Sequence, residues 1–127
     1  MLFELDCSKT VDEIDVSLRE AAKNHRFGLL GVHDLEQTLE QKGLPINMTC
    51  RVYEICNPQQ AKQVLQQNGS FSSLLPCRVS VYRSGETLKL STVLPTSLFS
   101  LIGDENVLSA ARTVEEDIKA MMREAAR

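Results

Sequence analysis

The sequence predicts an α+β fold, a two-layer sandwich with helices on one face of a mostly antiparallel sheet. Three observations support this prediction. Strand-like and helix-like stretches alternate along the chain, the clearest strands alternate apolar with polar residues, and the helix-like stretches carry one apolar stripe. Such alternation is typical of a sheet covered on one side only. The order of the elements further suggests a ferredoxin-like core of two split β-α-β units, with an added strand and a C-terminal helix.

Five stretches are predicted strands because they are rich in apolar residues or alternate regularly. They span residues 2–7, 27–33, 48–56, 77–83 and 87–93. The last two form a hairpin around Ser84-Gly85, in which Cys77, Val79 and Val81 alternate with polar residues. A helix separates residues 48–56 from 77–83, so we predict that these two strands run parallel through a crossover.

Capping signals define where the helices begin. Thr10 and Glu13 fit a capping box, Asp34 is a preferred cap, and Asn57 followed by Pro58 is a strong helix start. The expected helices cover residues 10–24, 34–43, 57–69, 95–102 and 104–125, the last with Asp104 as its cap. Residues 70–76 are expected to form a connecting loop. Glu115 and Lys119 are expected to form an exposed ion pair on the last helix.

The length and charge of the chain exclude several classes of protein. At 127 residues the chain fits a single domain, residues 1–127. The 14 basic and 17 acidic residues give a net charge of −3, so we expect neither nucleic acid nor an anionic membrane as partner. No apolar stretch reaches the length of about 18 residues that a membrane span needs, and the N-terminus does not resemble a signal peptide. We therefore expect a cytoplasmic protein.

The cysteines and histidines give no metal or cofactor pattern. The four cysteines are Cys7, Cys50, Cys56 and Cys77, and none forms a CxxC pair. Together with only two histidines, this provides no zinc spacing, so we predict neither a metal site nor another cofactor. Buried, inert thiols are the ordinary expectation. The predicted crossover would place Cys56 and Cys77 at opposite ends of the sheet, beyond the roughly 7 Å that a disulfide spans.

Cys56 is the sharpest candidate for chemistry. It ends a strand immediately before a helix cap, where free backbone N–H groups and the helix dipole favour a thiolate. The competing interpretation is that Cys56 is a small buried residue that only fills space, and that Asn57 only caps the helix. Glu54 lies two residues away on the same face of the strand, and burial would raise its pKa. We favour a solvated position or a hydrogen-bond donor for this carboxylate.

The remaining candidates have simpler explanations. Cys77 is predicted to point into the core, and Asp34 is explained as a helix cap. His33 adjoins Asp34, and we interpret it as solvated or structural rather than as a base. We place the candidate pocket at the junction between the third strand and the helix that follows it. Its residues are Glu54, Cys56, Asn57, Cys77 and Asp34.

The polar face of the sheet has three possible uses. Its predicted members are Arg78, Ser80, Tyr82, Lys89 and Ser91, with Arg51 and Tyr53. It could stack on single-stranded RNA, but the acidic net charge argues against that use. A dimer interface or a plain solvated face is favoured. Residues 98–102 are apolar on more sides than a core requires, which predicts a homodimer.

Two stretches together suggest a known family. They are Val-Tyr-Glu-Ile-Cys-Asn-Pro at 52–58 and Leu-Leu-Pro-Cys-Arg-Val at 74–79, with Phe-Gly-Leu-Leu at 27–30 upstream. From about Leu5 to the last helix, the chain resembles the prokaryotic domain-of-unknown-function family 302. The resemblance implies a small α/β domain, often alone on its chain and compatible with a dimer. It brings no established activity and therefore no catalytic residue.

One position departs from the family pattern. Members often carry an acidic residue just before the proline that follows the hairpin, and here Leu94 precedes Pro95. A family site that used this acidic residue would be altered in this chain.

Two functional hypotheses follow from the sequence. The leading one is a non-catalytic ligand-binding or interaction domain that acts as a homodimer, with a pocket for a small molecule near Cys56. The alternative is a thiol-dependent redox or sulfur-handling protein that uses Cys56.

Overall fold

The structure is a computed structural model, and it describes residues 1–103 and 105–127; the predicted cap at Asp104 lies outside this range. The strands are β1 (Leu2–Cys7), β2 (Gly28–Asp34), β3 (Cys50–Cys56), β4 (Cys77–Ser84) and β5 (Thr87–Val93). The helices are α1 (Val11–Asn24), α2 (Leu35–Gln41), α3 (Pro58–Gln67), α4 (Pro95–Ser100) and α5 (Glu105–Ala126), with a 3-10 helix, η1 (Gly69–Leu74). None of the helices described has the length and apolar character that crossing a membrane requires.

The sheet has the strand order β1-β5-β4-β3-β2, and each neighbouring pair is antiparallel. The predicted α+β sandwich with an antiparallel sheet is therefore confirmed. The parallel crossover between β3 and β4 was wrong, because these strands are antiparallel neighbours in which Ile55 lies opposite Cys77. The ferredoxin-like strand order was wrong too. In the described chain only β1 and β2 form a split unit around α1, with the three other strands between them.

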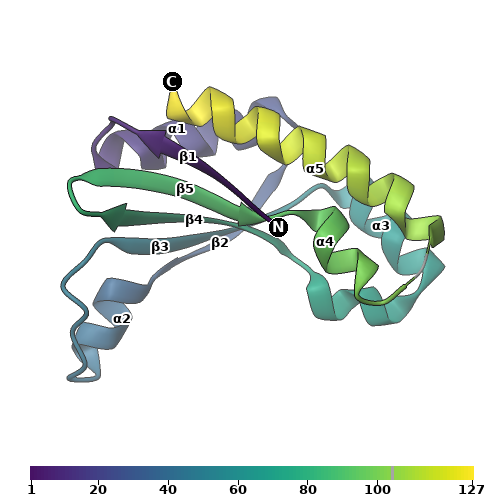
Figure 1. The fold of residues 1–127 in the computed structure, drawn as a ribbon, viewed down its shortest axis with the longest axis horizontal. Helices are drawn as coiled ribbons and strands as arrows, with labels where there is room; N and C mark the ends of the chain where they lie inside the picture. Colours follow the sequence, from purple (N-terminus) through teal and green to yellow (C-terminus); the bar gives the residue numbers. More distant parts are fainter. Residues whose placement is uncertain (104) are drawn as a thin grey trace.

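Two helices cover one face of this sheet. Figure 1 shows α1 and α5 side by side over the sheet, with α2 projecting on the opposite side. The core between the layers includes Ile14 and Leu18 of α1, Ile118 of α5 and the strand residues Val81 and Leu90, each no more than 3% exposed. The opposite face of the sheet is left uncovered by α1 and α5, so the molecule has the two layers that the alternation predicted.

A second, smaller core lies beyond one end of the sheet. It contains Val64, Phe71, Phe99, Val107 and Ala111, from α3, η1, α4 and the first half of α5. The rings of Phe71 and Phe99 meet edge to face with their centroids 5.3 Å apart. This corrects the expected loop over residues 70–76, because burying Phe71 folds much of that serine-rich stretch into η1.

This second core also explains why β3 and β4 are antiparallel. Helix α3 packs on α5 and η1 rather than across the sheet, so the chain re-enters the sheet at the end where it left. The predicted buried stripe on α3 shrinks to Val64, while Ala61 is half-buried and Leu65 is 38% exposed.

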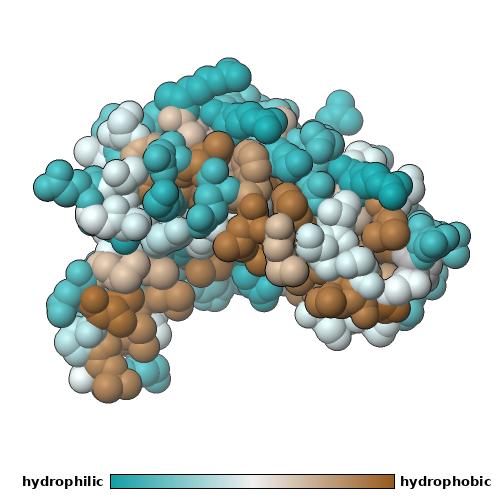
Figure 2. Space-filling view, in the orientation of Figure 1, coloured by the Kyte–Doolittle hydropathy of each residue, from teal (hydrophilic) through white to brown (hydrophobic). Residues whose placement is uncertain are grey.

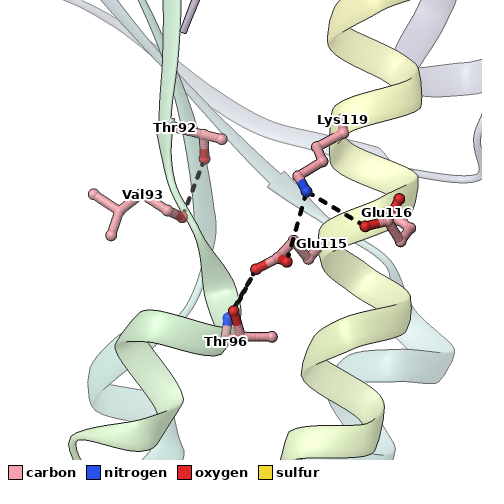
Figure 3. A network of polar contacts seen from close by, with 6 residues as sticks. All are labelled: Thr92, Val93, Thr96, Glu115, Glu116 and Lys119. Carbon is pink, nitrogen blue, oxygen red and sulfur yellow. Dashed lines mark hydrogen bonds and ion pairs between the residues drawn. The ribbon is translucent and has the colours of Figure 1, made fainter. Parts of the chain in front are cut away.

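Helix α4 is held in place by a carboxylate from α5. Its cap residue, Leu94, makes no side-chain hydrogen bond. Glu115 Oε1 instead accepts hydrogen bonds from the backbone N and the Oγ1 of Thr96, at 3.1 and 2.7 Å (Figure 3). Lys119 Nζ lies 3.8 Å from Glu115 Oε2, but the Glu115 side chain is only 12% exposed. The pair expected on the surface is therefore largely enclosed, and Glu115 supplies the acceptor that Leu94 cannot.

Two residues predicted for the polar face lie on the covered face. Tyr53 is opposite Val79 and Arg51 is opposite Val81, and both valines are buried under the helices. Tyr53 is 2% exposed, and its hydroxyl donates to Asp15 Oδ1 of α1 at 2.6 Å. This hydrogen bond is what allows the phenol group to sit inside the core.

Candidate functional site

A narrow cleft lies on the seam between the two cores, where β3 ends and α3 begins. Phe27, Ile55 and Val114 of the first core and Val64 and Phe99 of the second line its wall. The cleft has a volume of about 20 Å³. A cavity needs about 10–15 Å³ to hold one water molecule, so the cleft is barely larger than that.

A wider apolar depression adjoins this cleft. The two share Pro76, Cys77 and Phe99, and the depression extends along Val93 and Leu98. Its volume is about 180 Å³. An engineered apolar cavity of about 150 Å³ is enough to bind benzene, so the depression has room for a group of that size.

The cap of α3 fixes the turn at the cleft. Asn57 Oδ1 accepts a hydrogen bond from the backbone N of Gln60 at 3.1 Å, and Pro58 occupies the first helical turn. Proline has no backbone N–H that needs a partner, so with Gln60 capped by Asn57 few backbone N–H groups in the first turn of α3 remain unpaired. Asn57 therefore holds the backbone where the chain leaves β3.

Both cleft thiols lie at the same end of the sheet. Ile55 is directly opposite Cys77, which places Cys56 one step away on the neighbouring strand. The expectation that Cys56 and Cys77 lie at opposite ends is therefore wrong, and both line the cleft. Successive strand residues face opposite sides, so the two Cβ atoms diverge. All four cysteines are free in the structure.

Burial decides the protonation of Cys77. Its removal from solvent raises the pKa of the Cys77 thiol to about 11, and the nearby Cys56 thiol acts in the same direction. The guanidinium of Arg78 opposes this rise more weakly. Cys77 is therefore a neutral thiol at physiological pH and a poor nucleophile.

Gln60 adds a polar group that the sequence did not single out. Its Nε2 donates to Asp117 Oδ2 of α5 at 3.0 Å. Its Oε1 is buried and has no hydrogen-bond partner among the described residues. Buried carbonyl oxygens normally find a partner, so this one is free to accept a hydrogen bond from a bound molecule. Nothing in the sequence distinguishes Gln60 from the other glutamines of α3.

The other two candidate residues lie outside the cleft. Glu54 is on the open face of the sheet, with Oε1 2.6 Å from His33 Nε2 and Oε2 3.8 Å from Arg78 Nη2. Asp34 caps α2 at the far end of β2, where its Oδ1 accepts from the backbone N of Gln37 at 3.0 Å. The structure thus brings together Cys56, Asn57 and Cys77 and separates the two carboxylates from them.

The described residues contain no group of three or more histidine, cysteine, aspartate and glutamate side chains that could hold a metal ion. Apart from the amides of Asn57 and Gln60 and the two thiols, the wall of the cleft is apolar.

Comparison with known proteins places the chain in a family. The model of the domain of unknown function DUF302 matches residues 3–125. The chain belongs to the DUF302 family. The crystal structure of the uncharacterized conserved protein DUF302 from Bacillus stearothermophilus has a TM-score of 0.95 and 29% identity to it, over 99% of this chain and 98% of that one. No curated protein matches the chain. Membership in DUF302 establishes the fold and assigns no activity.

Proposed function

We propose that this chain is a non-catalytic domain that binds a small, mostly apolar ligand at the seam beside Cys56 and Cys77. The observation that carries the proposal is the pair of adjoining apolar hollows on either side of Cys77. Ligand sites are typically concave and apolar with a few polar groups that fix orientation. Here the side chain of Gln60 supplies such a group, because its buried Oε1 has no hydrogen-bond partner among the described residues.

The lining of the cleft favours binding over catalysis. General acid–base chemistry needs a titratable group with a pKa near the working pH, within hydrogen-bond reach of the reacting atom. No carboxylate or histidine lines the narrow cleft, and the Cys77 thiol is neutral. The groups that remain can bind and orient a molecule.

Titration with phenol tests the binding proposal. We expect saturable changes in the amide NMR signals of residues around Cys77 and Phe99, with a dissociation constant of about 1 mM, or −4 kcal/mol. Leu98→Phe should fill the wider hollow and weaken binding. Leu101→Phe is the matched control on the same segment, since Leu101 is 76% exposed. Changes that never saturate, or equal binding by both variants, would contradict the proposal.

We further propose that the domain acts as a homodimer in the cytoplasm of a prokaryote, as one folded unit over residues 1–127. The four free cysteines suit a reducing compartment. Light scattering at tens of micromolar should give twice the chain mass of 14.2 kDa. A monomer mass would argue against the dimer and would leave the ligand proposal standing.

A second candidate function is favoured by the position of the thiols. Because Cys56 and Cys77 line one cleft, a thiol-dependent redox or sulfur-handling role for Cys56 has a structural basis. Alkylation at graded pH, with mass mapping of each cysteine, separates the two candidates. Fast reaction of Cys56 well below about pH 8 would support the thiol role, and uniform inertness would support binding.

A further inference from the structure

An apolar arm projects from the molecule without entering either core. We define the arm as residues 35–49, which form α2 and the loop that leads into β3. Helix α2 has no buried residue, and in the loop Leu44 is 65% and Ile46 38% exposed. Figure 1 shows α2 extending away from the side of the sheet opposite α1 and α5, and Figure 2 shows hydrophobic surface gathered on it. Contiguous exposed apolar surface of this kind marks an interaction site.

The sheet face on the side of the arm is also uncovered. Its central charges are paired with one another: Lys89 Nζ lies 2.8 Å from Asp6 Oδ1, and Glu54 lies between His33 and Arg78. The Tyr82 hydroxyl donates to Glu4 Oε2 at 2.6 Å. The face therefore carries both signs of charge side by side, with the carboxylates of Glu4, Asp6 and Glu54 bonded to Tyr82, Lys89, Arg78 and His33.

Two further exposed apolar residues lie at the diagonally opposite corner of this face. Leu2 of β1 is 58% exposed and Val93 of β5 is 36% exposed, and the two are cross-strand partners. The arm lies next to Cys50, at the start of β3, near the β2 edge of the sheet. Leu2 and Val93 lie at the other end of the strands, near the β1 edge.

We infer that the open sheet face and the arm bind a second copy of this chain. The inference rests on the homodimer proposed above and names its surface. A twofold axis along the other diagonal of the face, across the line that joins the arm to the Leu2–Val93 corner, would place each arm over that corner of the other copy. The two sheets would then cross at a large angle. Orthogonal sheet packing of this kind is an established arrangement.

Charge favours a second copy over other occupants. An isologous interface presents the same patch from both sides, so a patch of one sign would repel itself. A face that carries both signs of charge close together reduces that repulsion, because the cations Lys89 and Arg78 can also meet carboxylates of the other copy. Nucleic acid would need an excess of basic groups to neutralise its phosphates, and neither this face nor the chain, with its net charge of −3, provides one.

The competing surface is the segment that the sequence pointed to, residues 98–102. Phe99 is buried in the second core, and Leu101 is 76% exposed at the end of α4. Leu101 is therefore at least as exposed as Leu44 of the arm but lies on a different part of the molecule, which makes it a matched control.

The test compares three variants by sedimentation equilibrium, with circular dichroism to check their fold. The double variant Leu44→Ser with Ile46→Ser removes apolar groups from the arm, Leu2→Ser removes one from the corner, and Leu101→Ser is the control. All four positions are exposed, so we expect each variant to fold. We expect the arm variant to weaken dimerisation about tenfold or more, which is about 1.4 kcal/mol, and the corner variant to weaken it less. The control should dimerise like the wild type.

Each other outcome overturns a distinct statement. A wild-type chain that stays monomeric at every concentration overturns the homodimer and this inference together. A dimer that survives the arm variant, or that only Leu101→Ser disrupts, overturns the assignment of the surface and leaves the homodimer in place.

Discussion

Two neighbouring cross-strand pairs on β4 and β5 show how differently the two faces of the sheet are used. Val81 pairs with Leu90, and both are fully buried under the helices. Tyr82 pairs with Lys89 one step further along, and these side chains bind Glu4 and Asp6 on the open face. A shift of one residue thus separates a side chain that holds the fold together from one that is available to a partner.

The sharpest way to break this comparison is to truncate a residue on the covered face. Leu90→Ala should lower the free energy of unfolding by about 3 kcal/mol, because it removes buried apolar groups and leaves a cavity. Urea denaturation, followed by circular dichroism, measures the change. A loss below about 1 kcal/mol would mean that the covered face is not the main source of stability.

The alternation that defines these faces could be read from the sequence for β4 and β5 but not for β3. Along most of β4 and β5, valines and leucines occupy the covered face and charged or hydroxyl residues the open one. The pattern breaks at the end of β5, where the buried Thr92 is on the covered face and Val93 on the open face. In β3, Arg51 and Tyr53 share the covered face with Ile55, while Val52 and Cys50 lie on the open face. Both faces of β3 thus mix polar with apolar residues, so its orientation depends on its neighbours and not on its own pattern.

The candidate site was predictable only where it rests on local signals. The cap at Asn57 depends only on adjacent residues and was predicted correctly; its Oδ1 accepts a hydrogen bond from the backbone N of Gln60. The meeting of Cys56 and Cys77 depends on how residues 57–76 return to the sheet. That path runs through the second core, where Phe71 and Phe99, which are far apart in the sequence, are in contact. Such a contact leaves no periodic signal.

The next largest effect concerns the polar residue on the covered face. Two causes raise the pKa of Tyr53 from 10.0 to about 12: burial of the hydroxyl is the larger, and its hydrogen bond to Asp15 is the next. The folded state therefore keeps this proton more tightly than the unfolded state does. The stability that the protonated Tyr53 hydroxyl gives the folded state is fully present below pH 10 and is lost as the pH rises toward 12, an effect on the order of 2 kcal/mol.

Denaturant titrations between pH 9 and 12 measure this loss, with Tyr53→Phe as the control. The variant should be less stable by about 1 kcal/mol at neutral pH, because the hydrogen bond to Asp15 is gone. It should also lose less stability at alkaline pH, with the remainder due to Cys77, whose pKa is raised in the same range. Identical alkaline profiles for the two proteins would show that Tyr53 is not buried in this way.

A smaller effect is expected where the sheet meets the cleft. Asn57→Ala should cost about 1 kcal/mol, because it removes the acceptor for the backbone N–H of Gln60. Asn57→Asp should cost little, since aspartate caps equally well and suits the helix dipole. Thermal and urea denaturation of both variants test this. If stability is unchanged in both while phenol binding is lost, Asn57 belongs to the binding site and its structural role is wrong.

The smallest effect should come from the open face. Lys89 is the direct neighbour of Leu90, but its side chain is 30% exposed and its partner Asp6 is 70% exposed. Water and salt screen such a pair, and holding two side chains in place costs conformational entropy. Lys89→Ala should therefore leave the free energy of unfolding almost unchanged. The measurement belongs in the arm variant Leu44→Ser with Ile46→Ser, at a protein concentration where sedimentation shows only monomer, so that dimerisation does not add to the apparent stability. In the wild-type chain the same substitution should shift the dimer equilibrium and its salt dependence, because Lys89 would lie within the interface. A loss of stability in the monomeric sample as large as that of Asn57→Ala would show that the open face stabilises the fold by itself, and the contrast between the two faces would fail.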